Sequence, residues 1–319
     1  MFRAFVLVRN LASSVQHLDF RKFTFEHVGL RFRELREVFS SLDVNPDDWV
    51  LEKGYVHLPP GSPGSPVGGI PNDIEDILLL FRLYKVGDIS FSRLAIIQPG
   101  GNKLVQLPYR SMNELNSYSP LPLELEPNEC QAWTAFATGI RASRSWTSNW
   151  FTAARRFFLS GGAKQFNPRW DDVDRIVDYT TALEAALVPE HDFLKRRMSM
   201  RVAALVAPDD ASEQQAITKL FKQLYDVRSI VVHGSKLSDE NREWLLENCD
   251  QIERRVRQAL VAALRMLPID ESGRRTALAK VYDPGEDVHG EHALQIFREI
   301  KTDAVRKAIA TKIAGLAGL

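Results

Sequence analysis

Residues 220–234 read LFKQLYDVRSIVVHG, and this stretch decides how the rest of the chain is interpreted. Apolar residues recur in it every three or four positions, and Ile217 just before it continues the pattern. This periodicity predicts a helix with one buried face. The stripe consists of Ile217, Leu220, Phe221, Leu224, Val227 and Val231. Gly234 predicts a left-handed turn that ends the helix. Arg228 at the edge of the stripe and His233 at its end are not needed for packing, and they suggest a functional site.

Arg228 and His233 together suit the cleavage of a phosphodiester without a metal or cofactor. Five positions correspond to about 140° on an ideal helix, but a turn at Gly234 would let the imidazole swing round. A histidine can accept or donate a proton near neutral pH, and a planar arginine can donate paired hydrogen bonds to phosphate oxygens. Arg21 and His27, six positions apart, also satisfy a pattern of Arg, four to six residues and then His, so spacing alone also fits a polar helix cap beside a surface arginine.

The surroundings of this stretch have the texture of an all-helical domain over residues 130–268. Apolar periodicity predicts helices over about 130–141, 145–159, 170–188, 190–206, 212–232 and 239–267. Ser238 is a good N-cap for the last of these helices, and Pro268 ends it. A tail over 269–319 follows, with a basic turn around Arg274 and Arg275 and then a helix rich in Ala, Ile and Lys.

The first 120 residues have a different texture, which predicts a β-rich domain. Strands are expected within RAFVLV (3–8), FRKFTFEHV (20–28), GYVHL (54–58) and SRLAIIQ (92–98), while 72–87 could be helix or strand. The segment 59–71 is rich in Gly and Pro and is interpreted as a surface loop, and 121–129 as an interdomain linker. The predicted fold class is therefore α+β, with an N-terminal β-rich domain followed by a helical bundle.

Composition limits the classes of function. The formal net charge is +0, from 41 basic and 41 acidic residues, so any contact with nucleic acid must come from local patches. Two cysteines and no apolar run long enough to span a membrane predict a cytoplasmic protein with no membrane association. Paired arginines at 155/156, 196/197, 254/255 and 274/275 are interpreted mostly as solvated helix faces, and the tryptophans mostly as core. The segment DVHGEH (287–292) is a weak metal motif, and no metal site is predicted.

Three blocks resemble the ApeA-like branch of the HEPN domains. They are LFKQLYDVRSIVVHG, RIVDYTTALEAALVP (175–189) and RRMSMRVAALVA (196–207), within a region of resemblance that covers about 145–265. DILLLFRLYKVGDIS (76–90) more weakly resembles the β-rich domain that often precedes this type. The resemblance implies an all-helical homodimer in which Arg and His of both protomers build one composite site. Many such domains are metal-independent ribonucleases of toxin, CRISPR and abortive-infection (anti-phage) systems.

Carried over by position, the resemblance implies that Arg228 binds the scissile phosphate, His233 is the general acid or base, and Glu184 orients one of them. An ion pair between Glu184 and an arginine is the alternative structural role. Tyr225, Asp226 and Ser229 are the expected supporting residues, although Tyr225 could pack in the core and Asp226 could be a solvated acid. Many active members carry Asn, Asp or His where this chain has Ser229.

The expected partners are an RNA substrate, with tRNA as one candidate, and a second copy of the chain. The N-terminal domain is expected to sense a phage or host protein as the trigger. The alternative is a catalytically inactive HEPN module that dimerises or binds a ligand in a defence or regulatory complex.

Overall fold

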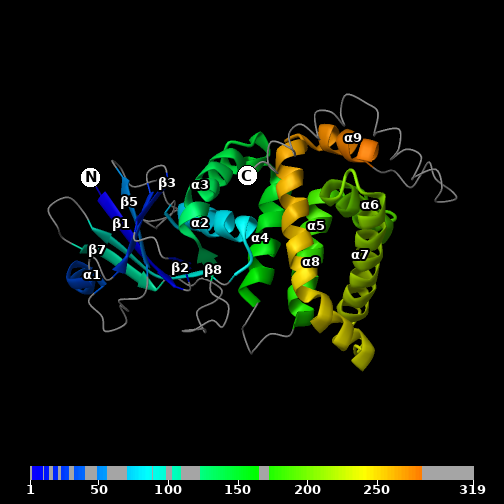
Figure 1. Cartoon of the computed structure of the whole chain (residues 1–319), viewed down its shortest axis with the longest axis horizontal. Helices are drawn as coiled ribbons and strands as arrows, with labels where there is room; N and C mark the ends of the chain where they lie inside the picture. Colours follow the sequence, from blue (N-terminus) through cyan, green and yellow to red (C-terminus); the bar gives the residue numbers. More distant parts are fainter. Residues whose placement is uncertain are drawn as a thin grey trace. The chain divides into compact units, whose positions relative to one another are not determined.

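A computed structural model describes residues 2–9, 11–13, 17–20, 23–28, 32–39, 49–55, 70–87, 89–97, 103–108, 123–164 and 172–281. The chain is an α+β protein: an antiparallel sheet lies in the N-terminal part, and the remainder is mostly helical (Figure 1). Two compact units divide the chain, one formed by 1–137 with 163–169 and the other by 138–162 with 170–319.

The N-terminal unit is built on a sheet with the strand order β3-β4-β5-β1-β6-β7, and each neighbouring pair is antiparallel. The strands are β1 (Phe2–Arg9), β3 (His17–Phe20), β4 (Phe23–His27), β5 (Trp49–Tyr55), β6 (Ser90–Ile97) and β7 (Lys103–Pro108). Strand β1 lies inside the sheet, and its residues 4–8 are all buried. An unbroken apolar run, AFVLV, fits a strand that is covered on both faces.

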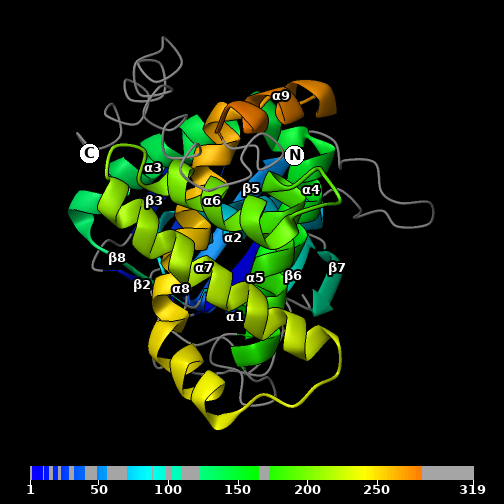
Figure 2. The same ribbon diagram turned by 90° about the vertical axis from the view of Figure 1, so that its right-hand side faces the viewer.

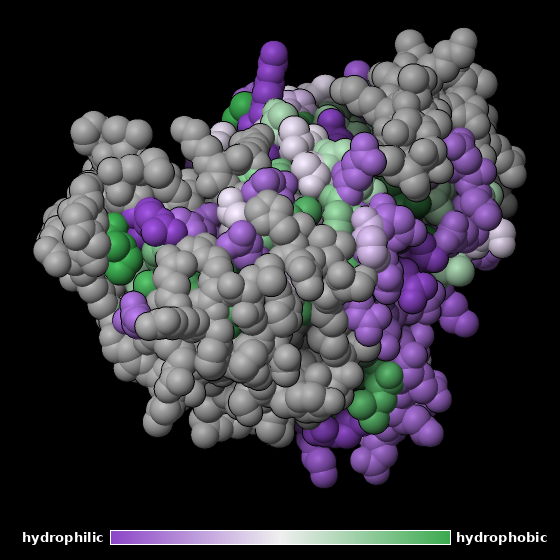
Figure 3. Space-filling model, turned by 60° about the vertical axis from the view of Figure 1, so that its left-hand side comes forward, coloured by the Kyte–Doolittle hydropathy of each residue, from purple (hydrophilic) through white to green (hydrophobic). Residues whose placement is uncertain are grey.

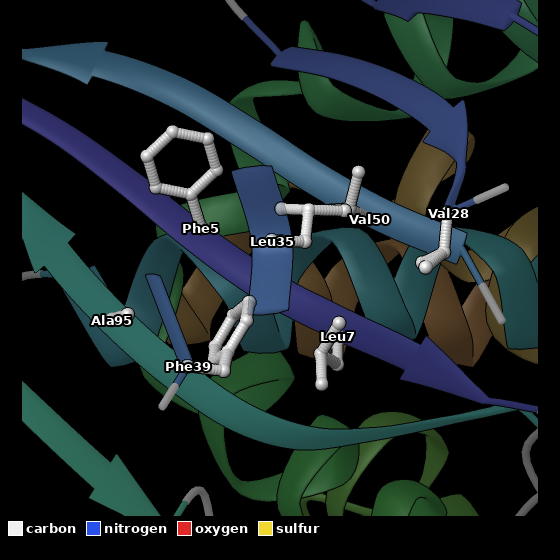
Figure 4. Close-up of a cluster of buried hydrophobic side chains, with 7 residues drawn as sticks. All are labelled: Phe5, Leu7, Val28, Leu35, Phe39, Val50 and Ala95. Atoms are coloured by element: carbon white, nitrogen blue, oxygen red, sulfur yellow. The ribbon is translucent and has the colours of Figure 1, made fainter. Parts of the chain in front are cut away.

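One face of this sheet is covered by helix α1 (Phe32–Phe39). Figure 4 shows Leu35 and Phe39 of α1 against Phe5 and Leu7 of β1, in a buried cluster that also contains Val28, Val50 and Ala95. The opposite face carries Phe25, which contacts Phe81 of helix α2 (Ile70–Tyr84) edge to face. Trp133 of helix α3 (Pro127–Arg141) stacks on Phe81 with ring centroids 4.3 Å apart, so the first half of α3 belongs to this core.

Most of the predicted strands are confirmed, with some differences. The segments at 3–8, 20–28 and 92–98 contain β1, β4 and β6, whereas GYVHL overlaps only the end of β5, which begins at Trp49. The segment 72–87 is mainly the helix α2, and α1, β3 and β7 were not predicted. The predicted loop at 59–71 lies almost entirely outside the described residues.

The segment 121–129, interpreted as a linker, contains ordered structure. Strand β8 (Leu123–Leu125) pairs in parallel with β2 (Leu11–Ser13), and helix α3 begins at Pro127. Leu123 and Leu125 are buried and Glu124 is exposed, which is the alternation of a strand with one covered face. The division between the two units falls inside α3, after Ala137, because Trp133 packs with the N-terminal sheet.

The second unit is helical, as expected. Its main helices are α4 (Asn149–Lys164), α5 (Asp172–Leu187), α6 (Leu194–Val206), α7 (Ala211–Val232) and α8 (Asp239–Met266). Figures 1 and 2 show α5, α6, α7 and α8 as a bundle of neighbouring helices. The predicted bounds agree with these helices to within about five residues, because local periodicity and capping set them.

Polar caps fix the ends of these helices. The side chain of Asp210 accepts a hydrogen bond from the backbone N–H of Glu213, and Ser238 accepts one from Asn241, which confirms Ser238 as an N-cap. At the other end of α8, the hydroxyls of Ser143 and Ser145 donate to the carbonyls of Leu264 and Leu267. These bonds satisfy carbonyl groups that a helix end leaves without partners.

The predicted basic turn at Arg274 and Arg275 is instead a helix, α9 (Glu271–Val281). Arg274 is buried and donates to the carbonyl of Ala185, so it is a structural residue of the helical unit. The expected helix near the C-terminus and the segment 287–292 lie outside the described residues.

Large exposed apolar side chains of the described surface are Phe193, Val232, Leu246 and Ile269. In Figure 3, apolar groups are scattered among hydrophilic side chains at the lower right of the view.

Candidate functional site

Glu184 and Arg228 form the centre of the candidate site. Glu184 lies near the end of α5 and Arg228 near the end of α7, and Nη2 of Arg228 is 3.2 Å from Oε2 of Glu184. The two side chains are 18% and 21% exposed, so the ion pair is partly shielded from water while a ligand could still reach it. The structure thus joins two of the three predicted catalytic residues, which are 44 positions apart in the sequence.

Tyr225 completes this cluster. The Cζ atom of Arg228 lies 5.6 Å from the centroid of the Tyr225 ring, and the tyrosine is half-buried. Burial raises the pKa of Glu184 above its ordinary value, and the charge of Arg228 and the hydroxyl of Tyr225 oppose this rise only in part. Burial and the charge of Glu184 also raise the pKa of Tyr225, so its hydroxyl stays protonated at neutral pH.

The pairing of Glu184 with Arg228 leaves polar atoms without partners. Oε1 of Glu184 and Nε of Arg228 are buried, and neither makes a hydrogen bond to any part of the chain that the structure describes. A single hydrogen bond therefore joins the guanidinium to Glu184, in place of the two parallel bonds of a bidentate pair. An arginine held in this way keeps donor capacity that an anionic ligand could use.

His233 lies at the end of α7, as expected, and the turn after it is confirmed. Gly234 has φ +75°, and the backbone N–H groups of Gly234 and Ser235 donate to the carbonyls of Val231 and Ile230. This pattern of bonds is a Schellman motif, in which His233 is the C-cap residue. The turn leaves the His233 side chain exposed to solvent.

His233 does not join the Glu184–Arg228 pair through a direct contact. Among the described residues, no hydrogen bond or ion pair links its imidazole to either side chain. Only its backbone is engaged, through a hydrogen bond from its N–H to the carbonyl of Ser229. Ser229 itself is half-buried, and its backbone carbonyl is the part of the residue with a defined role.

Asp226 lies apart from Arg228, at the edge of the cluster. Its carboxylate is 57% exposed and forms an ion pair of 2.5 Å with Lys195 of α6. Two residues apart on a helix, Asp226 and Arg228 point to different sides. Asp226 therefore ties the start of α6 to the end of α7, which is a role that the sequence did not indicate.

The segment 188–193 between α5 and α6 lies at the same end of α6 as Lys195, and several arginines hold it in place. Arg201 is fully buried and pairs with Glu190, and Arg197 pairs with Glu190 and Asp192. Although burial raises it, the pKa of Glu190 is lowered overall, because Arg201 and Arg197 stabilise the carboxylate. Arg275 adds a hydrogen bond to the carbonyl of Pro189.

This network gives two exceptions to the interpretation of the paired arginines as mostly solvated. Arg197 and Arg274 are each 6% exposed or less, so at least one member of two of the pairs is structural. A pair of adjacent arginines on a helix points in two directions, and the sequence does not reveal which member is buried. Trp133, Trp146 and Trp150 are buried, which confirms their interpretation as core residues, and Trp170 lies outside the described residues.

The described residues contain neither a metal-binding cluster nor a membrane-spanning helix, and the comparisons with known proteins find no relative. Within the described residues, no group of three His, Cys, Asp or Glu side chains is placed to hold a metal ion. Across the same ranges, no helix has both the length and the apolar character needed to cross a membrane. Comparison with protein-family models, curated proteins and solved structures finds no match to this chain.

Proposed function

We propose that this protein is a metal-independent endoribonuclease of the HEPN type, with Arg228 and His233 at its active site. The observation that carries the proposal is the location of both residues in the last turns of α7, with Arg228 held by Glu184 and His233 exposed beyond it. An ordered guanidinium and an accessible imidazole are the two groups that phosphodiester cleavage by a 2′-hydroxyl requires.

Each residue has a definite role in this reaction. His233 accepts the proton of the ribose 2′-hydroxyl, or donates a proton to the leaving 5′-oxygen. Arg228 donates hydrogen bonds to the nonbridging phosphate oxygens as negative charge accumulates on them. Glu184 and Tyr225 position the guanidinium through the contacts described above.

The active form is proposed to be a homodimer in which the ends of two α7 helices meet at one phosphate. Among the described residues no hydrogen bond or ion pair joins Arg228 to His233, which leaves room for an arrangement in which one protomer supplies the arginine and the other the histidine. The N-terminal unit is proposed to sense a phage or host protein, and the setting is anti-phage defence in the cytoplasm. A substrate such as tRNA would be bound by local basic groups, since the formal net charge is +0.

The proposal is tested by expressing wild type, Arg228→Ala and His233→Ala in cells and by incubating the purified proteins with total RNA in the presence of EDTA. Wild type should be toxic and should cut RNA, and each variant should lose at least about 100-fold in cleavage rate. His191→Ala is the matched control, because His191 is also exposed and lies in the segment 188–193. Wild type that cuts no RNA, with or without phage infection, would overturn the proposal.

A non-catalytic module is the second candidate, and the same ion pair favours it. Arg228 already has a partner in Glu184, so it could serve only to join α5 to α7. In that case Arg228→Ala would lower the stability of the protein, while His233→Ala would change neither stability nor RNA integrity. Light scattering of both variants shows whether dimerisation depends on these residues.

A further inference from the structure

A second polar cluster lies between α5 and α8, away from Glu184 and Arg228. Two rows of residues at four-residue spacing face each other there, namely Arg175 and Tyr179 on α5 and Cys249, Glu253 and Arg257 on α8. All five are at least nine-tenths buried. Arg175 precedes Glu184 by nine residues, which is about 13 Å along a helix, so the two clusters are distinct.

Arg175 accounts for most of the contacts in this cluster. It forms an ion pair with Glu253, donates to the sulfur of Cys249 at 3.1 Å, and lies 3.5 Å from the hydroxyl of Tyr179. Although burial lowers it, the pKa of Arg175 is raised overall by Tyr179, Glu253 and Cys249. The single carboxylate of the cluster is therefore already committed to Arg175.

Arg257 has no such partner. It is 9% exposed, its Nη1 atom is buried, and it makes no hydrogen bond or ion pair within the described part of the chain. Burial lowers the pKa of Arg257, and Glu253 offsets this effect only in part. Among these five residues two guanidinium groups share one carboxylate, and Arg257 makes no ion pair with it. A buried charge without a counter-charge is strongly destabilising, so a negatively charged group that completes the cluster would stabilise the fold.

We propose that Arg257 is the centre of a binding site for a small oxyanion of the phosphate class. Arg254 lies one turn earlier on α8, is exposed, and acts electrostatically on Arg257, so it supplies a second guanidinium at the solvent side. A planar guanidinium presents two parallel N–H groups that match two oxygens of one phosphate. Chloride offers a single acceptor centre to these two parallel donors, whereas an oxyanion offers two oxygens at a matching separation, which makes the oxyanion the preferred ligand.

Bound oxyanion would act as a stabiliser of the α5–α8 contact. Because it pairs with the buried charge of Arg257 only in the folded protein, it should raise the unfolding temperature by mass action. The bound group could be free phosphate or the phosphate of a small ester, and both present the same oxygens to Arg257. The inference does not depend on the proposed nuclease activity.

The test is thermal unfolding of the full chain, followed by circular dichroism at 222 nm, in phosphate and in chloride at equal ionic strength. With phosphate at ten times its dissociation constant, wild type should unfold about 3–6 °C higher than in chloride. Arg257→Met should lose this difference and should be at least as stable as wild type in chloride. Arg144→Met is the control, because it removes one exposed arginine from the same unit and should keep the phosphate effect.

Titration calorimetry with inorganic phosphate, sulfate and adenosine 5′-monophosphate identifies the source of the phosphate group. Saturable heat with phosphate alone indicates the free ion, and tighter binding of the monophosphate indicates an ester. Arg257→Lys, which keeps the charge but not the planar fork, should bind at least tenfold more weakly, and it serves if Arg257→Met does not fold. The same phosphate shift in wild type, Arg257→Lys and Arg144→Met, or no saturable binding to wild type, would overturn the inference.

Discussion

Replacing Glu253 by Gln should be the most damaging conservative change in the helical unit. Glu253 and Arg175 form an ion pair in which the side chains are 7% and 4% exposed. Glutamine keeps the volume of the side chain and removes only its charge, so packing should be unaffected. Arg175 would then lose its ion-pair partner, and Arg257 would lose the carboxylate whose charge acts on it.

Breaking one side of a buried ion pair costs about 3–5 kcal/mol, because the remaining charge loses its compensation. Whole domains are stable by about 5–15 kcal/mol, so Glu253→Gln should remove a large share of the stability of the helical unit. Urea titration at pH 7, followed by circular dichroism, measures the change. Adding Arg257→Met to the same chain should recover part of the loss, since it removes the second uncompensated cation.

Asp226→Asn is the matched control for Glu253→Gln. It also removes one carboxylate from an ion pair, but Asp226 and Lys195 are 57% and 41% exposed. Exposed pairs contribute about 0–1 kcal/mol, so this variant should unfold almost as wild type does. If Glu253→Gln and Asp226→Asn cost the same small amount, the reasoning from burial is refuted.

Three further changes test local features. Glu184→Gln should gain stability relative to wild type as pH rises from about 4.3, the usual glutamate pKa, through the raised pKa of Glu184. The reason is that only wild type must ionise a buried carboxyl over this range. Urea titrations from pH 4 to 8 measure the difference in the free energy of unfolding, and a difference that does not change with pH would contradict the prediction. Gly234→Ala should cost about 1–2 kcal/mol in urea titration because φ is +75°, with no crowding around a new Cβ, and Gly234→Asn should cost less. Gly161→Ala should cost about 1–3 kcal/mol in the same assay, because its Cβ would lie 2.7 Å from the buried ring of Tyr179. Gly139→Ala is the control, since the space around that residue is open. A smaller effect for Gly161→Ala than for Gly139→Ala would argue against the close contact.

Local patterns were sufficient for α3 to α8 and for the end of α7, but not for α1 or α2. The stripe that includes Leu224 and Val227 predicts α7, and Gly234 predicts the turn at which it ends. Ser238 predicts the start of α8. These features depend on residues three or four positions apart, which are neighbours in any helix whatever the rest of the chain does. Strands were predicted less well: β3 and β7 are the edge strands of the sheet, each paired with the strand next to it in the chain, and their short, partly polar sequences carry only a weak strand pattern.

For the candidate site too, the sequence predicted the residues and only the fold decided their contacts. The sequence identified Arg228, His233 and Glu184 as candidate residues, while their contacts required the fold. Glu184 meets Arg228 across 44 positions, and Asp226 turns to Lys195 across 31 positions. No periodicity encodes such pairs, since they depend on which helices pack together and at what height.

The sequence by itself determined that the described part of residues 130–268 is mostly helical, where those helices begin and end to within about five residues, and that an arginine and a histidine lie at the end of one of them. The tertiary structure alone decided that α3 begins in the N-terminal unit, that Glu184 holds Arg228, and that Arg257 is buried with no hydrogen bond or ion pair among the described residues. The physical reason is the range of the interactions. Helix formation and capping are set by residues a turn apart, whereas the burial and pairing of a charge are set by the packing of segments that only the complete fold brings together.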